Sequence, residues 1–378
     1  MLNRNDIKRM LTDLFRTEMA RHQKDALAVF DSPVENLWAN IPADILREAI
    51  LKAGQMFDYK PLAFSSLDLM TDYAYASYLK TKKVAFLTSG STGTPKVCVH
   101  TPAMIWEEAR GVAPLFTEVK RIVSLVPCNH LYGFTFTVAL PHILNVPVLT
   151  LPALPTQSWE KILQPKDLLV GFPLFWSYWL RCNEAFPPDI HVLSSTAPCK
   201  NEIIEALLKT GAARFTEIYG SSETGAIAHR HQPYKPFEIF PFWEVNMQAD
   251  TPRIKRKCGE EWQPLPDKVK IEQERFIYPL ERQDACVQVA GINVFPKRIE
   301  KILLTHPAVK ECRVRLMRPE EGDRLKVFVV VREDCPQPTA DELRAFLNRH
   351  NLTIHEIPRS FTFGAQLPIS DLGKDADW

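Results

Sequence analysis

A short apolar run followed by a loop of glycines and hydroxyl residues is the feature that most constrains this chain. Residues 84–87 read Val-Ala-Phe-Leu, and residues 88–96 read Thr-Ser-Gly-Ser-Thr-Gly-Thr-Pro-Lys. Glycines let the backbone bring its N–H groups close to a ligand, the hydroxyls add donors, and the lysine adds a positive charge. The pattern predicts a strand that runs into a phosphate-binding loop. Its spacing differs from that of a Walker loop, in which Gly-Lys-Ser/Thr follows a longer gap.

We call residues 88–96 the phosphate loop. Around it, short apolar runs alternate with helix-compatible segments. Such alternation predicts a layered α/β domain with a largely parallel sheet. The runs expected to form strands are residues 122–126, 146–149, 168–171 and 190–193. The segments with helical spacing of apolar residues are 4–30, 43–56, 67–80 and 133–144.

The pattern changes after about residue 240. Charged and apolar residues alternate over 252–280, which predicts short strands of a small β-rich subdomain with solvent-facing charges. A small α+β unit is expected to follow, with helices over 296–304 and 339–350 and strands over 309–316 and 326–331.

The length of 378 residues exceeds what one hydrophobic core normally holds, so two domains are expected. We predict an N-terminal domain over residues 1–281, a hinge over residues 282–284, and a small mobile C-terminal domain over 285–378.

Charge and composition exclude several classes of function. Lys and Arg number 46 against 45 Asp and Glu, and no basic run carries interleaved aromatics, so no nucleic-acid partner is expected. No stretch approaches the ~20 apolar residues of a membrane span, and the charged first residues do not form a signal-peptide core. We therefore predict a cytoplasmic protein. The eight cysteines are scattered without a Cys-x-x-Cys pair, which indicates reduced thiols.

Four further segments follow in an informative order. Residues 194–198 read Ser-Ser-Thr-Ala-Pro, 217–223 read Glu-Ile-Tyr-Gly-Ser-Ser-Glu, 265–267 read Leu-Pro-Asp, and 367–374 read Leu-Pro-Ile-Ser-Asp-Leu-Gly-Lys. Together with the phosphate loop, they resemble the motifs of the ANL superfamily of adenylate-forming enzymes, which includes acyl- and aryl-CoA synthetases. Three departures stand out: Ser222 replaces the usual threonine, Ser195 and Thr196 replace glycines, and Leu-Pro precedes Asp267 instead of Thr-Gly.

The resemblance implies a site for ATP and Mg²⁺. Tyr219 would stack on adenine, Ser222 would donate to the α-phosphate, and Glu223 would coordinate the magnesium ion through a hard carboxylate oxygen. Asp267 and Arg282 would contact the ribose hydroxyls. The complete set of implied ATP- or AMP-binding residues is Thr88, Ser89, Gly90, Ser91, Thr92, Gly93, Lys96, Thr196, Ala197, Pro198, Tyr219, Gly220, Ser221, Asp267 and Arg282.

The C-terminal motifs imply a domain that turns between two half-reactions. Lys374 would enter the site and offset the charge that develops during adenylation, as preorganised charges do in transition states. Asp284 falls at the hinge position. Gly291 would let the backbone pass close to a thiol arm, so it would line the thiol channel; one glycine between apolar pairs is also compatible with an ordinary hairpin turn.

Residues 127–134, which we call the acid segment, resemble the part of the family that gates the carboxylate end of the substrate. They read Pro-Cys-Asn-His-Leu-Tyr-Gly-Phe, and His130 is the candidate gate, although a packed histidine is the alternative. The expected substrate-binding residues are His130, Tyr132, Gly133, Phe134, Phe172 and Ser195. The aromatic side chains could line a flat pocket or belong to the core. Ser195 and Thr196 could narrow the pocket or donate to the substrate.

The implied activity is ATP-dependent activation of an aryl or compact acyl carboxylic acid as an acyl-adenylate, followed by transfer to a thiol. CoA is the expected thiol, and the phosphopantetheine of an acyl carrier protein is the alternative. A catalytically silent nucleotide- or acyl-binding homologue is a further alternative. The phosphate loop begins at residue 88, whereas family members carry a longer segment before it, so the resemblance implies a shortened N-terminal domain.

Overall fold

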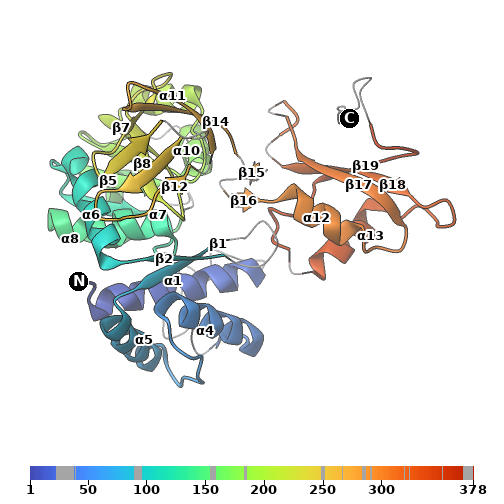
Figure 1. Cartoon of the computed structure of the whole chain (residues 1–378), viewed down its shortest axis with the longest axis horizontal. Coiled ribbons are helices and arrows are strands. Elements are labelled where there is room, and N and C mark those ends of the chain that lie inside the picture. Colours follow the sequence, from blue (N-terminus) through green and yellow to red (C-terminus); the bar gives the residue numbers. More distant parts are fainter. Residues whose placement is uncertain are drawn as a thin grey trace. The chain divides into compact units, whose positions relative to one another are not determined.

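The computed structural model describes residues 1–22, 38, 40–88, 96–153, 159–182, 185–247, 252–265, 267–282, 287–289, 292–318, 320–322, 324–350, 352–368 and 378. The chain forms two compact units (Figure 1). The first contains Met1–Thr88 and Lys96–Glu281, and the second contains Arg282–Trp378.

Three helices at the start of the first unit share one apolar core. They are α1 (Arg4–His22), α4 (Ala43–Phe57) and α5 (Leu67–Thr81). Apolar residues three and four apart, such as Ile7, Met10, Leu11 and Leu14, are buried on one face of α1, as the periodicity predicts. The predicted helices over 43–56 and 67–80 are confirmed. Residues 23–30 of the first predicted helix lie outside the described residues.

The predicted strand before the phosphate loop is β1 (Val84–Thr88). It pairs antiparallel with β2 (Lys96–His100), in a register that runs from Val84 opposite His100 to Thr88 opposite Lys96. The two ends of the phosphate loop are therefore held in adjacent strands by backbone pairing. Residues 89–95 lie outside the described residues.

A nine-stranded sheet forms the centre of the first unit, in the order β13-β14-β9-β8-β7-β6-β5-β3-β4. Its parallel part contains β4 (Val148–Thr150), β3 (Arg121–Ser124), β5 (Asp167–Gly171), β6 (His191–Ser194) and β7 (Arg214–Ser221). Its other strands are β8 (Gly225–Arg230), β9 (Phe237–Ile239), β14 (Phe276–Arg282) and β13 (Asp267–Glu272). The pairs β7–β8, β8–β9 and β9–β14 are antiparallel. The predicted parallel arrangement therefore holds only for β4, β3, β5, β6 and β7.

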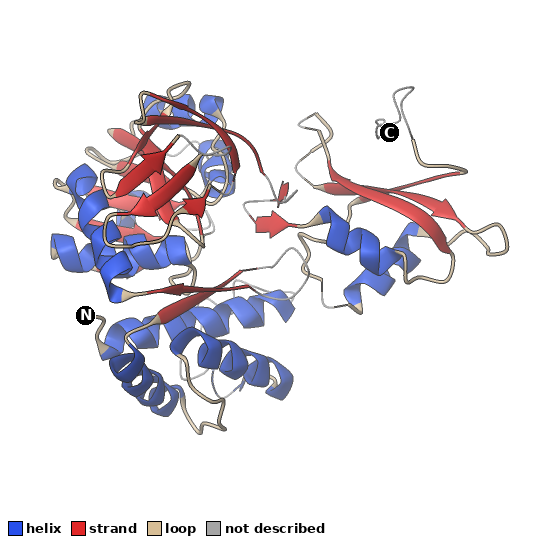
Figure 2. Ribbon diagram, viewed as in Figure 1, coloured by secondary structure: helices blue, strands red, loops and turns tan. Residues whose placement is uncertain are grey.

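Both faces of the parallel strands are buried, which explains why their sequences are continuous apolar runs. In β5, Leu168 and Val170 point into one core and Leu169 into another, because successive side chains alternate across a strand. One face is covered by α6 (Pro102–Val112), the 3-10 helix η1 (Ala113–Phe116) and α8 (Leu140–Leu144). The other face is covered by α9 (Trp159–Ile162), α10 (Pro173–Arg181) and α11 (Asn201–Lys209). Figure 2 shows helices on both sides of these strands.

The β-rich segment is divided between two sheets. A three-stranded sheet contains β10 (Trp243–Asn246), β11 (Arg253–Arg256) and β12 (Gln263–Pro264). The last part of the predicted β-rich segment 252–280 instead joins the nine-stranded sheet as β13 and β14. The expectation that charges in this segment face solvent is wrong for Arg256, which is buried.

The second unit is a small α+β fold. Strands β15 (Val287–Val289) and β16 (Ile292–Val294) form a hairpin. A three-stranded sheet of β17 (Val309–Leu316), β18 (Leu325–Val331) and β19 (Ser360–Gly364) shares its apolar core with α12 (Pro296–Leu303) and α13 (Ala340–Asn348). Thr339 and Glu342 form a capping box at the start of α13, which fixes where this predicted helix begins. Of the helices in the described residues, none has the length and apolarity needed to cross a membrane.

Candidate active site

The predicted site segments of the first unit meet at one edge of the sheet. Strands β3, β5, β6 and β7 are parallel, so their carboxyl ends lie at the same edge, where ligands bind in open α/β sheets. The acid segment follows β3, Phe172 follows β5, residues 195–198 follow β6, and residues 219–223 span the end of β7. The topology therefore gathers segments that the sequence analysis identified separately.

The turn from β7 to β8, residues 221–225, carries Ser222 and Glu223. Its shape is fixed by reciprocal bonds: the Ser221 N–H donates to Thr224 Oγ1 at 3.1 Å, and the Thr224 N–H donates to Ser221 Oγ at 3.3 Å. Gly220 is required beside it, because an added Cβ would lie 2.1 Å from the carbonyl oxygen of Gly225. We call residues 221–225 the β7–β8 turn.

Glu223 is ionised beside a lysine of the phosphate loop. Lys96 Nζ lies 2.9 Å from Glu223 Oε1. Burial opposes ionisation of Glu223, but the hydrogen bonds from Lys96, its own N–H and Ser221 outweigh burial and lower its pKa. An ionised carboxylate suits Mg²⁺, which usually takes one or two protein carboxylates and fills its other positions with water and substrate phosphates. Among the described residues, no group of three or more His, Cys, Asp or Glu side chains is arranged to hold a metal ion.

His100 on β2 supports the same turn and was missed from the sequence. Its Nε2 lies 2.8 Å from the carbonyl oxygen of Ser222, so this nitrogen donates. Burial lowers the pKa of His100, which keeps the ring neutral at pH 7. No local motif marked this histidine, because it lies four residues after Lys96 in an ordinary strand.

Tyr219 and Asp267, predicted to contact adenine and ribose, are hydrogen-bonded to each other. The Tyr219 hydroxyl donates to Asp267 Oδ2 at 2.6 Å, and Asp267 is only 8% exposed. Three strands separate β7 from β13 in the sheet order, so a flat sheet would place them about 19 Å apart. The sheet must curl for the two side chains to meet. The Phe237 ring of β9 lies 5.9 Å from the Tyr219 ring, on the same curled part.

The segment after β6 is anchored to β7. Ser195 Oγ donates to the carbonyl oxygen of Ile218 at 3.0 Å, so this hydroxyl is used within the protein. Thr196 adopts a φ of +76°, a left-handed conformation that is strained for a β-branched residue. Glycines occupy this position in the resembled family, and the backbone keeps a glycine-like conformation here although the side chain is threonine.

Glu217, two residues before Tyr219, is a second residue whose role was missed. Its Oε1 accepts from the Cys199 N–H at 2.7 Å, and its Oε2 accepts from Arg230 Nε at 2.6 Å. Burial raises the pKa of Glu217, against the opposing effect of Arg230. The pair fixes the end of the 195–198 segment to β7.

Two residues of the acid segment have different surroundings. The Tyr132 hydroxyl points to the carbonyl oxygens of Gly171 at 3.0 Å and Leu193 at 3.3 Å, which ties this segment to the ends of β5 and β6. Burial raises the pKa of Tyr132 well above its usual value. Phe134 is fully buried in the core with α1, α4 and α5, and its ring lies 5.1 Å from that of Phe86. Phe134 therefore packs in the core, the second of the two alternatives.

The remaining expected residues of this edge are also placed. His130 is exposed directly before α7 (Leu131–Phe134). Gly133 allows close packing, because an added Cβ would lie 2.1 Å from the carbonyl oxygen of Pro127. Phe172 is half-buried after β5. The predicted residues Ser89, Gly90, Ser91, Thr92, Gly93, Asp284, Gly291 and Lys374 lie outside the described residues, and Thr88 and Arg282 are described only by their strand positions.

Comparison with known proteins identifies the family. Residues 23–271 match the AMP-binding enzyme family, and residues 298–374 match the C-terminal domain of AMP-binding enzymes. The 4-coumarate–CoA ligase of Rhodobacter capsulatus is 34% identical over 310 residues, which are 80% of this chain and 77% of that protein. The 4-coumarate–CoA ligase of Halorhodospira halophila is 32% identical over 296 residues, 78% of this chain and 75% of that protein.

A solved structure supports the fold. The o-succinylbenzoate CoA synthetase of Bacillus subtilis superimposes with a TM-score of 0.65 and 19% sequence identity, over 77% of this chain and 67% of that one. The chain therefore belongs to the AMP-binding enzyme family, within the ANL superfamily of adenylate-forming enzymes that its motifs resemble.

Proposed function

We propose that this chain activates a carboxylic acid with ATP, releases pyrophosphate, and transfers the acyl group from AMP to the thiol of CoA. The observation that carries the proposal is the hydrogen bond between Tyr219, near the end of β7, and Asp267, at the start of β13. It supports the proposal because the residues expected to contact adenine and ribose are in contact with each other, and because β7 leads into Glu223. Family membership and the names of the curated relatives support the same reaction.

The charges of the site suit the first half-reaction. The carboxylate oxygen of the acid forms a bond to the α-phosphorus, and the bond to pyrophosphate breaks. Lys96, Ser222 and Lys374 are proposed to face the developing negative charge, where preorganised donors lower the barrier most. A magnesium ion bound with the nucleotide would be held by Glu223 and would neutralise phosphate charge.

We propose that the acid is aromatic. Two of the relatives are named 4-coumarate–CoA ligases, whereas a long-chain-fatty-acid–CoA ligase of Bacillus subtilis is 24% identical over 76% of this chain. Tyr132 and Phe172 at the carboxyl edge offer flat apolar surfaces for a ring. Burying a methylene contributes about 0.8 kcal/mol, about fourfold in affinity, so a pocket for long chains would show kcat/KM rising steadily from C6 to C16 acids. We expect cinnamates and benzoates to exceed all of these.

The second half-reaction is proposed to use a turned C-terminal domain. The proposed domains are residues 1–281 and 285–378, with Asp284 at the hinge and Gly291 beside the thiol arm. Reuse of one site for two reactions by domain rotation is a known type of conformational change. CoA is the proposed acceptor, and the phosphopantetheine of an acyl carrier protein is the alternative to be tested.

Exchange of labelled pyrophosphate into ATP tests the proposal directly. Purified protein is incubated with Mg²⁺, ATP and single acids from aromatic, short-chain and long-chain sets. Exchange with at least one acid is expected, and addition of CoA should then yield a thioester. Absence of exchange with every acid would overturn the proposal in favour of a silent binding homologue. Thioester formation with a carrier protein that bears phosphopantetheine, but not with CoA, would favour the alternative acceptor.

A further inference from the structure

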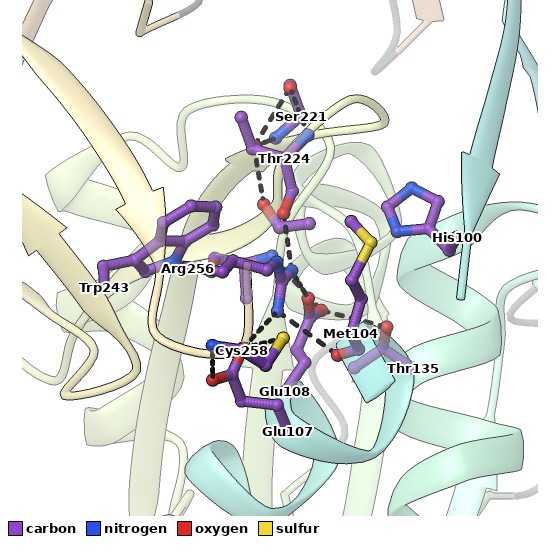
Figure 3. A network of polar contacts seen from close by, with 12 residues as sticks. His100, Met104, Glu107, Glu108, Thr135, Ser221, Thr224, Trp243, Arg256 and Cys258 are labelled. Atoms are coloured by element: carbon purple, nitrogen blue, oxygen red, sulfur yellow. Dashed lines mark hydrogen bonds and ion pairs between the residues drawn. The ribbon is translucent and has the colours of Figure 1, made fainter. Parts of the chain in front are cut away.

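A buried ion pair lies against the β7–β8 turn. Arg256, at the end of β11, pairs through Nη2 with Glu108 Oε2 on α6, and their side chains are 3% and 5% exposed. Figure 3 shows Arg256 between Trp243 and Glu108, with Thr224 directly above the pair. Removing two charges from water is costly unless each finds good partners, so the surrounding contacts indicate what the pair does.

Arg256 holds the turn directly. Its Nη2 donates to the carbonyl oxygen of Thr224 at 2.6 Å, and its Nη1 donates to that of Met104 on α6 at 3.2 Å. The planar guanidinium lies 4.7 Å from the centre of the Trp243 ring, a cation–π contact that helps to orient it. One side chain therefore connects the three-stranded sheet, helix α6 and the turn that carries Ser222 and Glu223.

Glu108 contacts residues beside both the β7–β8 turn and the acid segment. Its Oε1 accepts from the Ala226 N–H at 3.2 Å, directly after the turn, and from Thr135 Oγ1 at 3.0 Å. Thr135 begins a π-helix, η2 (Thr135–Ala139), that continues from the end of the acid segment. Gly225, with a φ of +77°, packs so closely that an added Cβ would lie 2.0 Å from Glu108 Oε2. A single carboxylate thus contacts the β7–β8 turn and the helix that follows the acid segment.

We infer that Glu108 and Arg256 are a positioning pair that sets the β7–β8 turn relative to the acid segment. This inference rests on the proposed function, in which the turn faces the ATP phosphates and magnesium and the acid segment faces the carboxylic acid. Neither residue is expected to touch a substrate. They act through the turn, because they fix the positions of Ser222 and Glu223 when the carboxylic acid binds.

The chemistry of the pair favours positioning over plain stabilisation. Apolar residues of the same volume often replace buried ion pairs without loss of stability. Such a replacement would remove the partners of the Thr224 carbonyl and the Ala226 N–H, which belong to the turn and to its first following residue. An ion pair with a forked donor can hold both groups at once, whereas a point charge such as lysine cannot reproduce the fork.

The test uses Arg256→Lys, which keeps the charge and loses the fork. A matched control is Arg121→Lys: Arg121 forms an equally close pair with buried Asp167, with Nη2–Oδ2 at 2.6 Å and Nε–Oδ1 at 2.9 Å. Both residues of the control pair start their strands, β3 and β5, so they lie at the edge opposite the proposed site. Similar losses of melting temperature are expected in the two variants.

Hydrogen exchange followed by mass spectrometry supplies a readout that needs no activity. In Arg256→Lys, amides of a peptide covering residues 221–226 should exchange about tenfold faster in ATP-free protein, and in Arg121→Lys they should not. Glu108→Gln keeps an acceptor oxygen, so it should slow this exchange relative to Glu108→Ala. The pyrophosphate-exchange assay should show an apparent Mg²⁺ requirement raised about tenfold in Arg256→Lys and unchanged in Arg121→Lys.

The outcomes separate the two proposals. Equal effects of Arg256→Lys and Arg121→Lys on exchange in residues 221–226 would show a merely structural pair and overturn the inference. Wild-type protein that never exchanges pyrophosphate would instead overturn the proposed function. Faster amide exchange in Arg256→Lys together with an unchanged Mg²⁺ requirement would also overturn the inference, because the turn would then move without consequence for the site.

Discussion

Removing one hydroxyl at Tyr219 should weaken ATP binding without affecting the acid. Tyr219→Phe keeps the ring that is proposed to stack on adenine, and it deletes the donor to Asp267 at 2.6 Å. Hydrogen bonds to charged groups contribute about 1.5–3 kcal/mol, and Asp267 is too buried for water to replace the lost donor fully. If half of this free energy appears in nucleotide binding, the KM for ATP should rise between about threefold and about tenfold.

The assay is pyrophosphate exchange with one substrate varied at a time. We expect the KM for ATP to rise and kcat to change little, because a ribose contact contributes about equally to the ground state and the transition state. The KM for the acid should stay constant. Urea unfolding of the same variant measures the share of the hydrogen bond that is lost as stability.

The chain offers a matched control in Tyr132→Phe. This tyrosine also lies at the carboxyl edge, but its hydroxyl points to the neutral carbonyls of Gly171 and Leu193, a contact of about 0.5–1.5 kcal/mol. It should raise the KM for the acid a few-fold and leave the KM for ATP unchanged. Equal changes in the KM for ATP in both variants, or none in Tyr219→Phe, would refute the assignment of Tyr219 and Asp267 to the nucleotide.

Three further predictions concern the backbone strain at Thr196, the pH dependence of stability and the role of Lys374. Thr196→Gly should raise the free energy of unfolding by about 1 kcal/mol in urea titrations, because relief of the positive φ exceeds the entropy cost of glycine, and Thr196→Ala should give a smaller gain. Burial lowers the pKa of His191 to about 3, so the unfolded chain binds the proton first as pH falls below 6.5. Stability should then drop, on the order of 2 kcal/mol by pH 5, and His191→Gln should flatten that slope between pH 7 and 5. Lys374→Ala should slow adenylation about 10² to 10³-fold and spare thioester formation from a preformed acyl-adenylate; equal losses would contradict the two-step use of one site.

Local sequence patterns predicted most elements of the fold because burial on both faces leaves a continuous apolar run. Leu168, Leu169 and Val170 illustrate this, since every residue of β5 is buried. The order of motifs also selected Asp267, whose immediate neighbours are atypical. Asp267 is hydrogen-bonded to Tyr219, and its contact with the ribose stays a prediction. The parallel character of the sheet was overestimated, because pairing direction depends on connections and not on the apolar content of a strand.

The supporting residues of the site were not predictable in the same way. Glu108 and Arg256 lie 148 residues apart, and each occurs in a segment whose charges normally face solvent. Arg256 lies two residues after Ile254 and so on the same buried face of β11, but only the tertiary contacts with Glu108 and Met104 on α6 show why a charged side chain occupies that position. Phe134 is a similar case, because an aromatic residue in a motif can belong to the pocket or to the core, and only tertiary contacts decide.

The curl of the nine-stranded sheet links ligand binding to cooperativity of folding. Tyr219 and Asp267 join strands that are separated by β8, β9 and β14. A nucleotide that contacts both residues would bind only when all five strands are in place, and ligands that bind only the native state add their binding free energy to its stability. ATP should therefore protect these five strands together against partial unfolding. They should then unfold cooperatively, instead of separating one by one from the β13 edge.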